Sequence, residues 1–135
     1  MSKRMTKDEL KEMSSLGALK PVGHAVLAFD NDATAGEARD AFQRAGFAAG
    51  DILSYTSAEL FPNLDDMMRT ASGAAGFGYE VVLMRRYMNL ASEGVFWLVV
   101  YAPDDRQTAL IKDVAGRLGA KTAVHYGLLM HEDLV

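Results

Sequence analysis

Short apolar runs recur four times along the chain and predict four strands. Each run has the length of a strand rather than of a helix, and polar or turn-forming residues bound it on both sides. The strongest run is VFWLVVY, in which alternate side chains point to opposite faces and both faces are apolar. The predicted strands cover residues 22–29, 51–56, 95–101 and 121–126.

Between these runs, apolar residues repeat with the period of a helix. Residues 34–45 and 104–118 each carry one apolar stripe, and the glycine after each stripe, Gly46 or Gly119, predicts the end of the helix. Thr34 with Glu37 has the spacing of a capping box, as do Thr56 with Glu59 and Thr6 with Glu9. Residues 63–92 keep one continuous apolar face, which predicts either one long helix or two helices broken near residues 76–78.

The first twenty residues differ from the rest in charge and in apolar content. They carry five basic and three acidic side chains, whereas the remainder of the chain is acidic. Leu10 and Met13 form only a thin apolar stripe on the predicted helix. We therefore interpret residues 1–20 as a helical arm and linker, and residues 21–135 as a single domain.

Two strand–helix–strand halves of similar size predict an α+β fold. The arrangement is that of a ferredoxin-like two-layer sandwich, with a four-stranded antiparallel sheet in the order 4-1-3-2 and helices on one face only. In such a sandwich the chain covers one sheet face, so the face that carries Trp97 needs another cover.

Two segments resemble small bacterial heat-induced, general-stress-type proteins. They are AVLAFDNDATAGEARDAFQRAGFAAGDILSY near the start and VHYGLLMHEDL near the end, about half of the chain in total. The resemblance implies the ferredoxin-like fold and no catalytic residues. Such relatives often carry a glycine-rich, membrane-like middle section, but here that section contains Arg69, Glu80, Arg85 and Arg86. This departure argues against membrane insertion.

Composition narrows the classes of function. The chain has 135 residues, a net charge of −4 and no cysteine. The acidic balance argues against nucleic-acid binding, and the absence of cysteine excludes a thiolate nucleophile or metal ligand. The longest apolar run is half the length of a transmembrane helix, and the N-terminus lacks the apolar core of a signal peptide. We expect a cytoplasmic protein.

Four residues form the candidate ligand site. In the predicted strand order, His24 and His125 lie on neighbouring strands, at one end of the sheet. Trp97 and Tyr101 lie on the sheet face that lacks a predicted cover. Together these four side chains could line a pocket for a small molecule or for acid–base chemistry. With three histidines and no ligand motif, we expect no metal and no cofactor.

The same open face predicts self-association. Gly73, Gly76 and Gly78 would let a second helix approach closely, and Arg85 and Arg86 have no carboxylate at helical spacing. With Trp97 these residues form the candidate interface of a homodimer. The competing explanation is that the 63–92 segment folds back and covers the sheet of its own chain. The predicted function is a non-enzymatic, stress-type assembly or binding module; the alternative is a ligand-binding or catalytic dimer that uses the open face.

Overall fold

The computed structural model describes residues 4–15, 19, 21–66, 78–127 and 130–135. The four predicted strands and the helices predicted over residues 34–45 and 104–118 are found at their expected places, with ends shifted by a few residues. In chain order the elements are α1 (Lys7–Ser15), β1 (His24–Phe29), α2 (Asp32–Arg44), the 3₁₀ turn η1 (Ala49–Asp51), β2 (Ile52–Thr56), α3 (Ser57–Leu60), α5 (Gly78–Ser92), β3 (Phe96–Tyr101), α6 (Asp105–Arg117), β4 (Thr122–Tyr126) and β5 (His131–Asp133).

The strands form one antiparallel sheet in the order β2-β3-β1-β4-β5. The first four strands have the predicted order. The fifth, β5, was not predicted, because HED is short and polar and gains its place only by pairing with β4, where Tyr126 is opposite His131. The α+β class is therefore confirmed, with five strands in the sheet instead of four.

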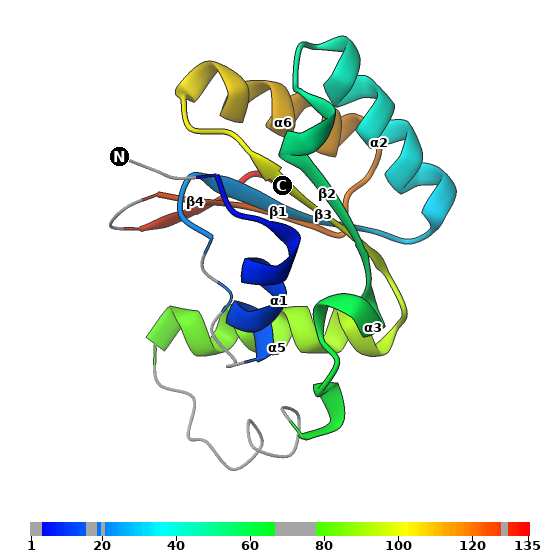
Figure 1. The fold of residues 1–135 in the computed structure, drawn as a ribbon, viewed down its shortest axis with the longest axis vertical. Helices are drawn as coiled ribbons and strands as arrows, with labels where there is room; N and C mark the ends of the chain where they lie inside the picture. The colour runs from blue at the N-terminus through cyan, green and yellow to red at the C-terminus, as the bar shows by residue number, and fades with distance from the viewer. Residues whose placement is uncertain (1–3, 16–18, 20, 67–77, 128–129) are drawn as a thin grey trace.

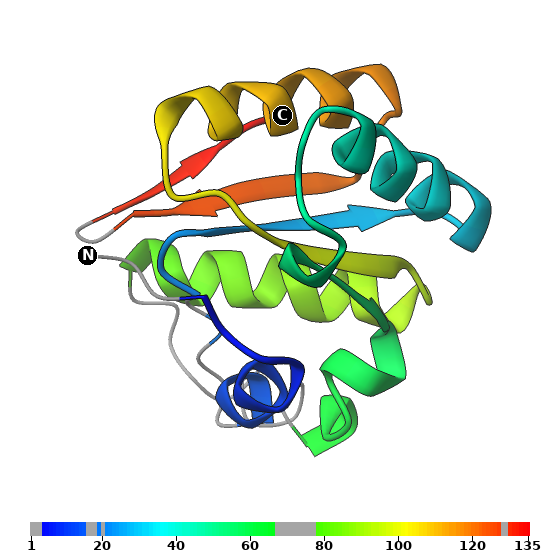
Figure 2. The same cartoon turned by 45° about the horizontal axis from the view of Figure 1, so that its top comes forward.

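Helices cover both faces of this sheet, whereas the sequence predicted a cover on one face only. Figure 1 shows α2 and α6 on one side of the strands and α1, α3 and α5 on the other, and Figure 2 shows the same three layers from a second direction. The chain between β2 and β3 crosses to the second face and returns, so that α5 packs beneath the sheet. Residues 78–92 of the 63–92 segment thus cover the sheet of their own chain. The competing explanation in the sequence analysis predicted such a cover, in place of one from a partner subunit.

The face under α2 and α6 carries a fully apolar core, here called the first core. Alternation within each strand sends Ala25, Leu27 and Phe29 from β1, and Leu98 and Val100 from β3, to this face. Phe42 from α2 and Ile111 from α6 pack onto them and are completely buried. The predicted stripes of both helices therefore face the sheet.

The opposite face carries the second core, which is richer in aromatic and polar groups. Trp97 is completely buried there, with edge-on ring contacts to Phe61 at 5.3 Å and to Tyr87 at 5.5 Å between centroids. The Trp97 indole N–H donates to Ser57 Oγ at 2.9 Å, and the Ser57 hydroxyl donates to Val95 O at 2.6 Å. Because its polar atom has a partner, Trp97 is buried without an unpaired donor.

A pair of tyrosine hydroxyls closes the second core on the β4 side. The hydroxyls of Tyr87 and Tyr126 lie 2.6 Å apart, and both side chains are buried. Burial raises the pKa of Tyr87 well above its usual value, so the pair is neutral. The two rings thus contribute apolar area, and one hydroxyl donates a hydrogen bond to the other.

The N-terminal helix belongs to the second core. Leu10 and Leu19 are buried there at 0% and 1% exposure, and α1 packs against α3. Two buried leucines contact the second core from this segment. So few apolar residues form only a thin stripe in the sequence. The division at residue 20 stays a prediction, but the arm of the sequence analysis is in contact with the sheet domain.

Two of the three predicted capping boxes are formed, and the third helix has a different N-cap from the predicted one. The Thr6–Glu9 and Thr56–Glu59 capping boxes are present, with reciprocal hydrogen bonds between 2.8 and 3.2 Å. At α2, however, Asn31 is the N-cap, and its side chain accepts from the Thr34 N–H at 2.8 Å. The helix begins at Asp32, earlier than predicted, because asparagine caps as well as threonine does.

None of the helices in the described ranges combines the length and the apolar character needed to cross a membrane.

Candidate functional site

The structure places three of the four predicted ligand-site residues on one face of the sheet and His125 on the other. His24 and Tyr101 are opposite each other in the β1–β3 pairing, with ring centroids 5.0 Å apart. Trp97 shares their face but is completely buried in the second core. Val124 and Tyr126 of β4 belong to that core, so alternation places His125 on the opposite face, where its Nε2 lies 2.8 Å from Ala102 O. The two histidines therefore do not share a pocket.

The predicted interface residues fall into two groups. Gly73 and Gly76 lie outside the described residues. The prediction of one helix or two over residues 63–92 also depends on residues outside the described ranges. Gly78 is the first residue of α5. Arg85 is exposed on α5, and Arg86 forms an ion pair with Asp133 of β5 at 3.2 Å. Arg86, which the sequence analysis assigned to a partner subunit, thus has a partner in its own chain.

A groove of about 230 Å³ lies elsewhere, at the β2 edge of the first-core face. On this face β2 contributes Ile52, which is buried, followed by Ser54 and Thr56, which are small, polar and exposed. Helix α2 cannot pack tightly against these two, so a space remains between helix and strand. Its lining comes from α2 (Asp32, Ala35, Gly36, Arg39), β2 (Ser54, Tyr55, Thr56), α3 (Glu59) and β3 (Phe96, Trp97, Leu98).

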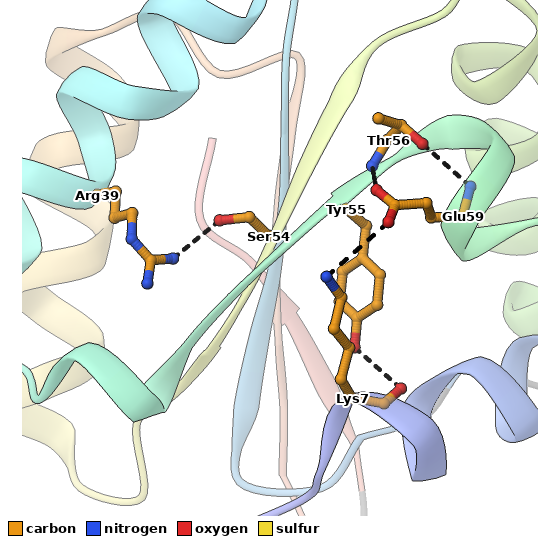
Figure 3. A network of polar contacts seen from close by, with 6 residues as sticks. All are labelled: Lys7, Arg39, Ser54, Tyr55, Thr56 and Glu59. Carbon is orange, nitrogen blue, oxygen red and sulfur yellow. Dashed lines mark hydrogen bonds and ion pairs between the residues drawn. The ribbon is translucent and has the colours of Figure 1, made fainter.

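Arg39 crosses the groove from α2 to the edge strand. Its Nη1 donates to Ser54 Oγ at 2.8 Å (Figure 3). The same Nη1 donates to Ile52 O at 2.7 Å, and Nη2 lies 3.4 Å from Ala49 O. In the described part of the chain these contacts are all with neutral oxygens, and no carboxylate pairs with Arg39. The groove therefore contains a positive charge that is held in place but not neutralised.

Two carboxylates line the same groove. Asp32 lies in the first turn of α2, and Glu59 lies in α3, beyond the end of β2. One oxygen of Glu59 accepts from the Thr56 N–H at 2.8 Å, and the other lies 3.9 Å from Lys7 Nζ. Figure 3 shows Arg39 reaching Ser54 from α2, while the Glu59 carboxylate lies at the α3 end of β2 and is directed at Thr56 and Lys7. The groove thus presents charges of both signs, of which Arg39 and Glu59 are held by hydrogen bonds.

The floor between these charges is partly apolar. Phe96 is only partly buried against the first core, and Leu98 lies beside it on the same face of β3. A methyl group added at Gly36 on the α2 wall would meet no atom within 4 Å. A small molecule with both charged and apolar parts therefore fits the chemistry of the lining.

The polar side chains of the groove also protect the sheet edge. Strand β2 pairs only with β3, so one of its sides is an edge. On that side the Ile52 N–H donates to Ala49 O, Ile52 O accepts from Arg39, and the Thr56 N–H donates to Glu59. Three backbone groups on this side of β2, near its two ends, are thus paired within the chain and are not offered to another strand.

Arg39, Ser54 and Glu59 were not among the predicted site residues. A sequence signal for Arg39 exists, since positions 35, 36, 42 and 43 hold no carboxylate. This is the argument that was applied to Arg85 and Arg86, but its extension to Arg39 needs the position of β2, which the sequence does not give. In the described ranges, no three His, Cys, Asp or Glu side chains are grouped so that they could hold a metal ion.

The chain was also compared with known proteins. No family model, no curated protein and no solved structure matches it.

Proposed function

We propose that the protein is a non-enzymatic binding module that holds a small zwitterion in the groove between α2 and β2. The observation that carries this proposal is the Arg39 guanidinium, fixed by neutral oxygens at 2.7 and 2.8 Å and open to an anionic ligand group. A guanidinium can hold a carboxylate through two parallel hydrogen bonds. The nearby carboxylates of Asp32 and Glu59 would repel a simple anion but attract a ligand that also carries an ammonium group.

The groove thus offers a separate contact for each of three parts of the ligand. The carboxylate lies on Arg39, the ammonium group faces Asp32 and Glu59, and an apolar side chain lies over Phe96. The volume of about 230 Å³ suits a molecule of amino-acid size, below the range of about 300–1,000 Å³ for larger ligands. In this proposal the groove binds without chemistry, because Arg39 and Glu59 already serve structural hydrogen bonds.

The proposal includes the stress-protein resemblance and a ferredoxin-like core. In this view β1, α2, β2, β3, α6 and β4 are the ferredoxin-like unit, since α2 and α6 cover one face and the strand order agrees. The long segment between β2 and β3, together with α1, adds the second helical layer, and β5 extends the sheet. The alternative of a ligand-binding or catalytic dimer at an open sheet face loses its support, because that face is covered.

L-Leucine and two matched analogues test the ligand class. We expect L-leucine to bind more tightly than 4-methylpentanoate, which lacks the amine, and than 3-methylbutylamine, which lacks the carboxylate. Each loss removes one charged contact, and a hydrogen bond to a charged group contributes about 1.5–3 kcal/mol. Isothermal titration calorimetry and amide shifts in the NMR spectrum measure the affinity and the place of binding. Equal affinity for all three would contradict the charged subsites, and no binding of any would refute the proposal.

Two variants and one control locate the site. Arg39→Gln removes the guanidinium and should weaken L-leucine binding by at least tenfold. Gly36→Leu fills the open space on the α2 wall and should also block binding, while leucine favours the helix more than glycine does. Arg44→Gln removes an exposed arginine from the same helix and should leave binding unchanged. If Gly36→Leu is folded and still binds normally, the ligand lies elsewhere.

The homodimer of the sequence analysis rested in part on an uncovered sheet face, and the chain's own helices cover that face. We therefore expect the mass in solution to be near the 14.7 kDa of one chain. Light scattering after size exclusion at micromolar concentration measures it, and the single Trp97 should show blue-shifted fluorescence because it is buried. A mass twice as large would restore the homodimer, with a helical surface as its interface.

A further inference from the structure

His24 is a buried imidazole, 1% exposed, whose two nitrogens contact backbone groups of opposite polarity. Nε2 accepts a hydrogen bond from the Met5 N–H at 3.2 Å, and Nδ1 lies 3.0 Å from Val22 O. An amide N–H can only donate and a carbonyl oxygen can only accept. The contacts therefore require the neutral ring with its proton on Nδ1.

The Met5 hydrogen bond fastens the N-terminal segment to β1. Just beyond Met5, the Lys7 carbonyl accepts from the Tyr55 hydroxyl at 3.3 Å, and the Lys7 ammonium lies 5.0 Å from the centre of the Tyr55 ring. Leu10 then enters the second core. Residues 4–15 are thus held by His24 at one end and by Tyr55 and the core along α1.

Other charged groups surround the imidazole. Arg4, in the N-terminal segment, forms an ion pair with Asp51 of η1 and lies 5.2 Å from the centre of the Tyr101 ring, which in turn contacts His24. The Asp51 carboxylate favours a protonated imidazole, whereas Arg4 and His125 of β4 disfavour it. Burial is the largest influence, and it lowers the pKa of His24 from 6.5.

We infer that His24 is a pH-sensitive latch for the N-terminal segment. A proton on Nε2 would point at the Met5 N–H, so protonation replaces an attractive contact by a repulsive one and places a positive charge beside Arg4. The segment is held at neutral pH and loosened in mild acid. Its release uncovers the apolar side chains of the second core against which Leu10 packs.

The direction of the pH dependence follows from the two states. In the released state His24 is exposed to water, with a pKa near the ordinary 6.5, and in the latched state the pKa is lower. Between these two values the released state binds more protons. The latch is therefore fully effective above about pH 6.5 and weakens as the pH falls towards the latched-state pKa.

Hydrogen exchange at pH 7.5 and 5.5, corrected for intrinsic rates, tests the latch on the full chain. We expect the protection of residues 4–15 to fall at pH 5.5, by up to about tenfold for one imidazole with a released-state pKa of 6.5, while α2 and α6 keep theirs. His24→Gln cannot be protonated, and its amide oxygen can still accept from Met5, so it should abolish the difference. His125→Gln removes the neighbouring imidazole on the other face and should keep the difference.

Two results would overturn the inference. One is equal protection of residues 4–15 at both pH values, and the other is an unchanged fall in a folded His24→Gln. If His24→Gln does not fold, NMR titration of the unmodified protein decides. The latch requires the His24 ring protons and the Met5 amide to titrate with one midpoint below 6.5, and separate midpoints or a His24 midpoint at or above 6.5 would contradict it.

Discussion

Replacing Trp97 by alanine should lower the free energy of unfolding by about 3–5 kcal/mol, the usual cost of truncating a buried large aromatic side chain. Trp97 is completely buried, its ring contacts Phe61 and Tyr87, and its indole N–H is bonded to Ser57. The change leaves a cavity and removes the donor that pairs with Ser57. For a chain of this size the melting temperature should fall by roughly 10–20 °C.

Urea unfolding followed by far-ultraviolet circular dichroism measures this cost, since Trp97 is the only tryptophan and its fluorescence is lost in the variant. Val82→Ala is the control: Val82 lies on α5 at 52% exposure, and its truncation should change the free energy by less than about 0.5 kcal/mol. A cost below about 1 kcal/mol for Trp97→Ala would mean that this sheet face is an open surface, as the sequence analysis expected.

Truncating Leu10 to alanine should cost about 2–5 kcal/mol, the range for a fully buried leucine. Leu10 is 0% exposed and belongs to the same core as Trp97, although it comes from the arm that the sequence places outside the domain. Deletion of residues 1–18 should cost more than Leu10→Ala, because it also removes the contacts of Lys7 with Tyr55 and Glu59.

Thermal and urea unfolding of both variants give the comparison. Glu12→Gln is a control on the exposed side of α1 and should remain within about 0.5 kcal/mol of the unmodified protein. The sequence analysis places residues 1–20 outside the domain, and such an arm would shift the melting temperature by only a few degrees on deletion. If that small shift is observed, residues 1–20 lie outside the domain in solution. The contact of Leu10 with the second core then contributes little to stability.

Local elements were the most predictable part of the fold. The run VFWLVVY predicts β3 because seven apolar residues in succession, rich in β-branched and aromatic types, suit a central strand. The Thr56–Glu59 capping box predicts the start of α3 because both hydrogen bonds are made within four residues. Such signals depend on neighbours in sequence, and they are readable without the fold.

The candidate site was less predictable than the fold. His24 and Tyr101 were chosen from their places on the strands, and they are indeed in contact. Arg39 was not chosen, because its contacts lie on β2 and η1, at least ten residues away. The role proposed for His24 also depends on its hydrogen bond with the Met5 N–H, nineteen residues away in the chain. No helical or strand periodicity connects these two positions.

The sequence by itself determined the α+β class, the order of the first four strands and the two faces of β3, because alternation and helical period follow from the geometry of the backbone. Tertiary structure decided which groups cover those faces. An apolar face in a sequence shows that a cover is needed but does not name it, and here α1, α3 and α5 of the same chain supply it. The groove at Arg39 and the contact of Met5 with His24 arise only when segments distant in the sequence are packed side by side.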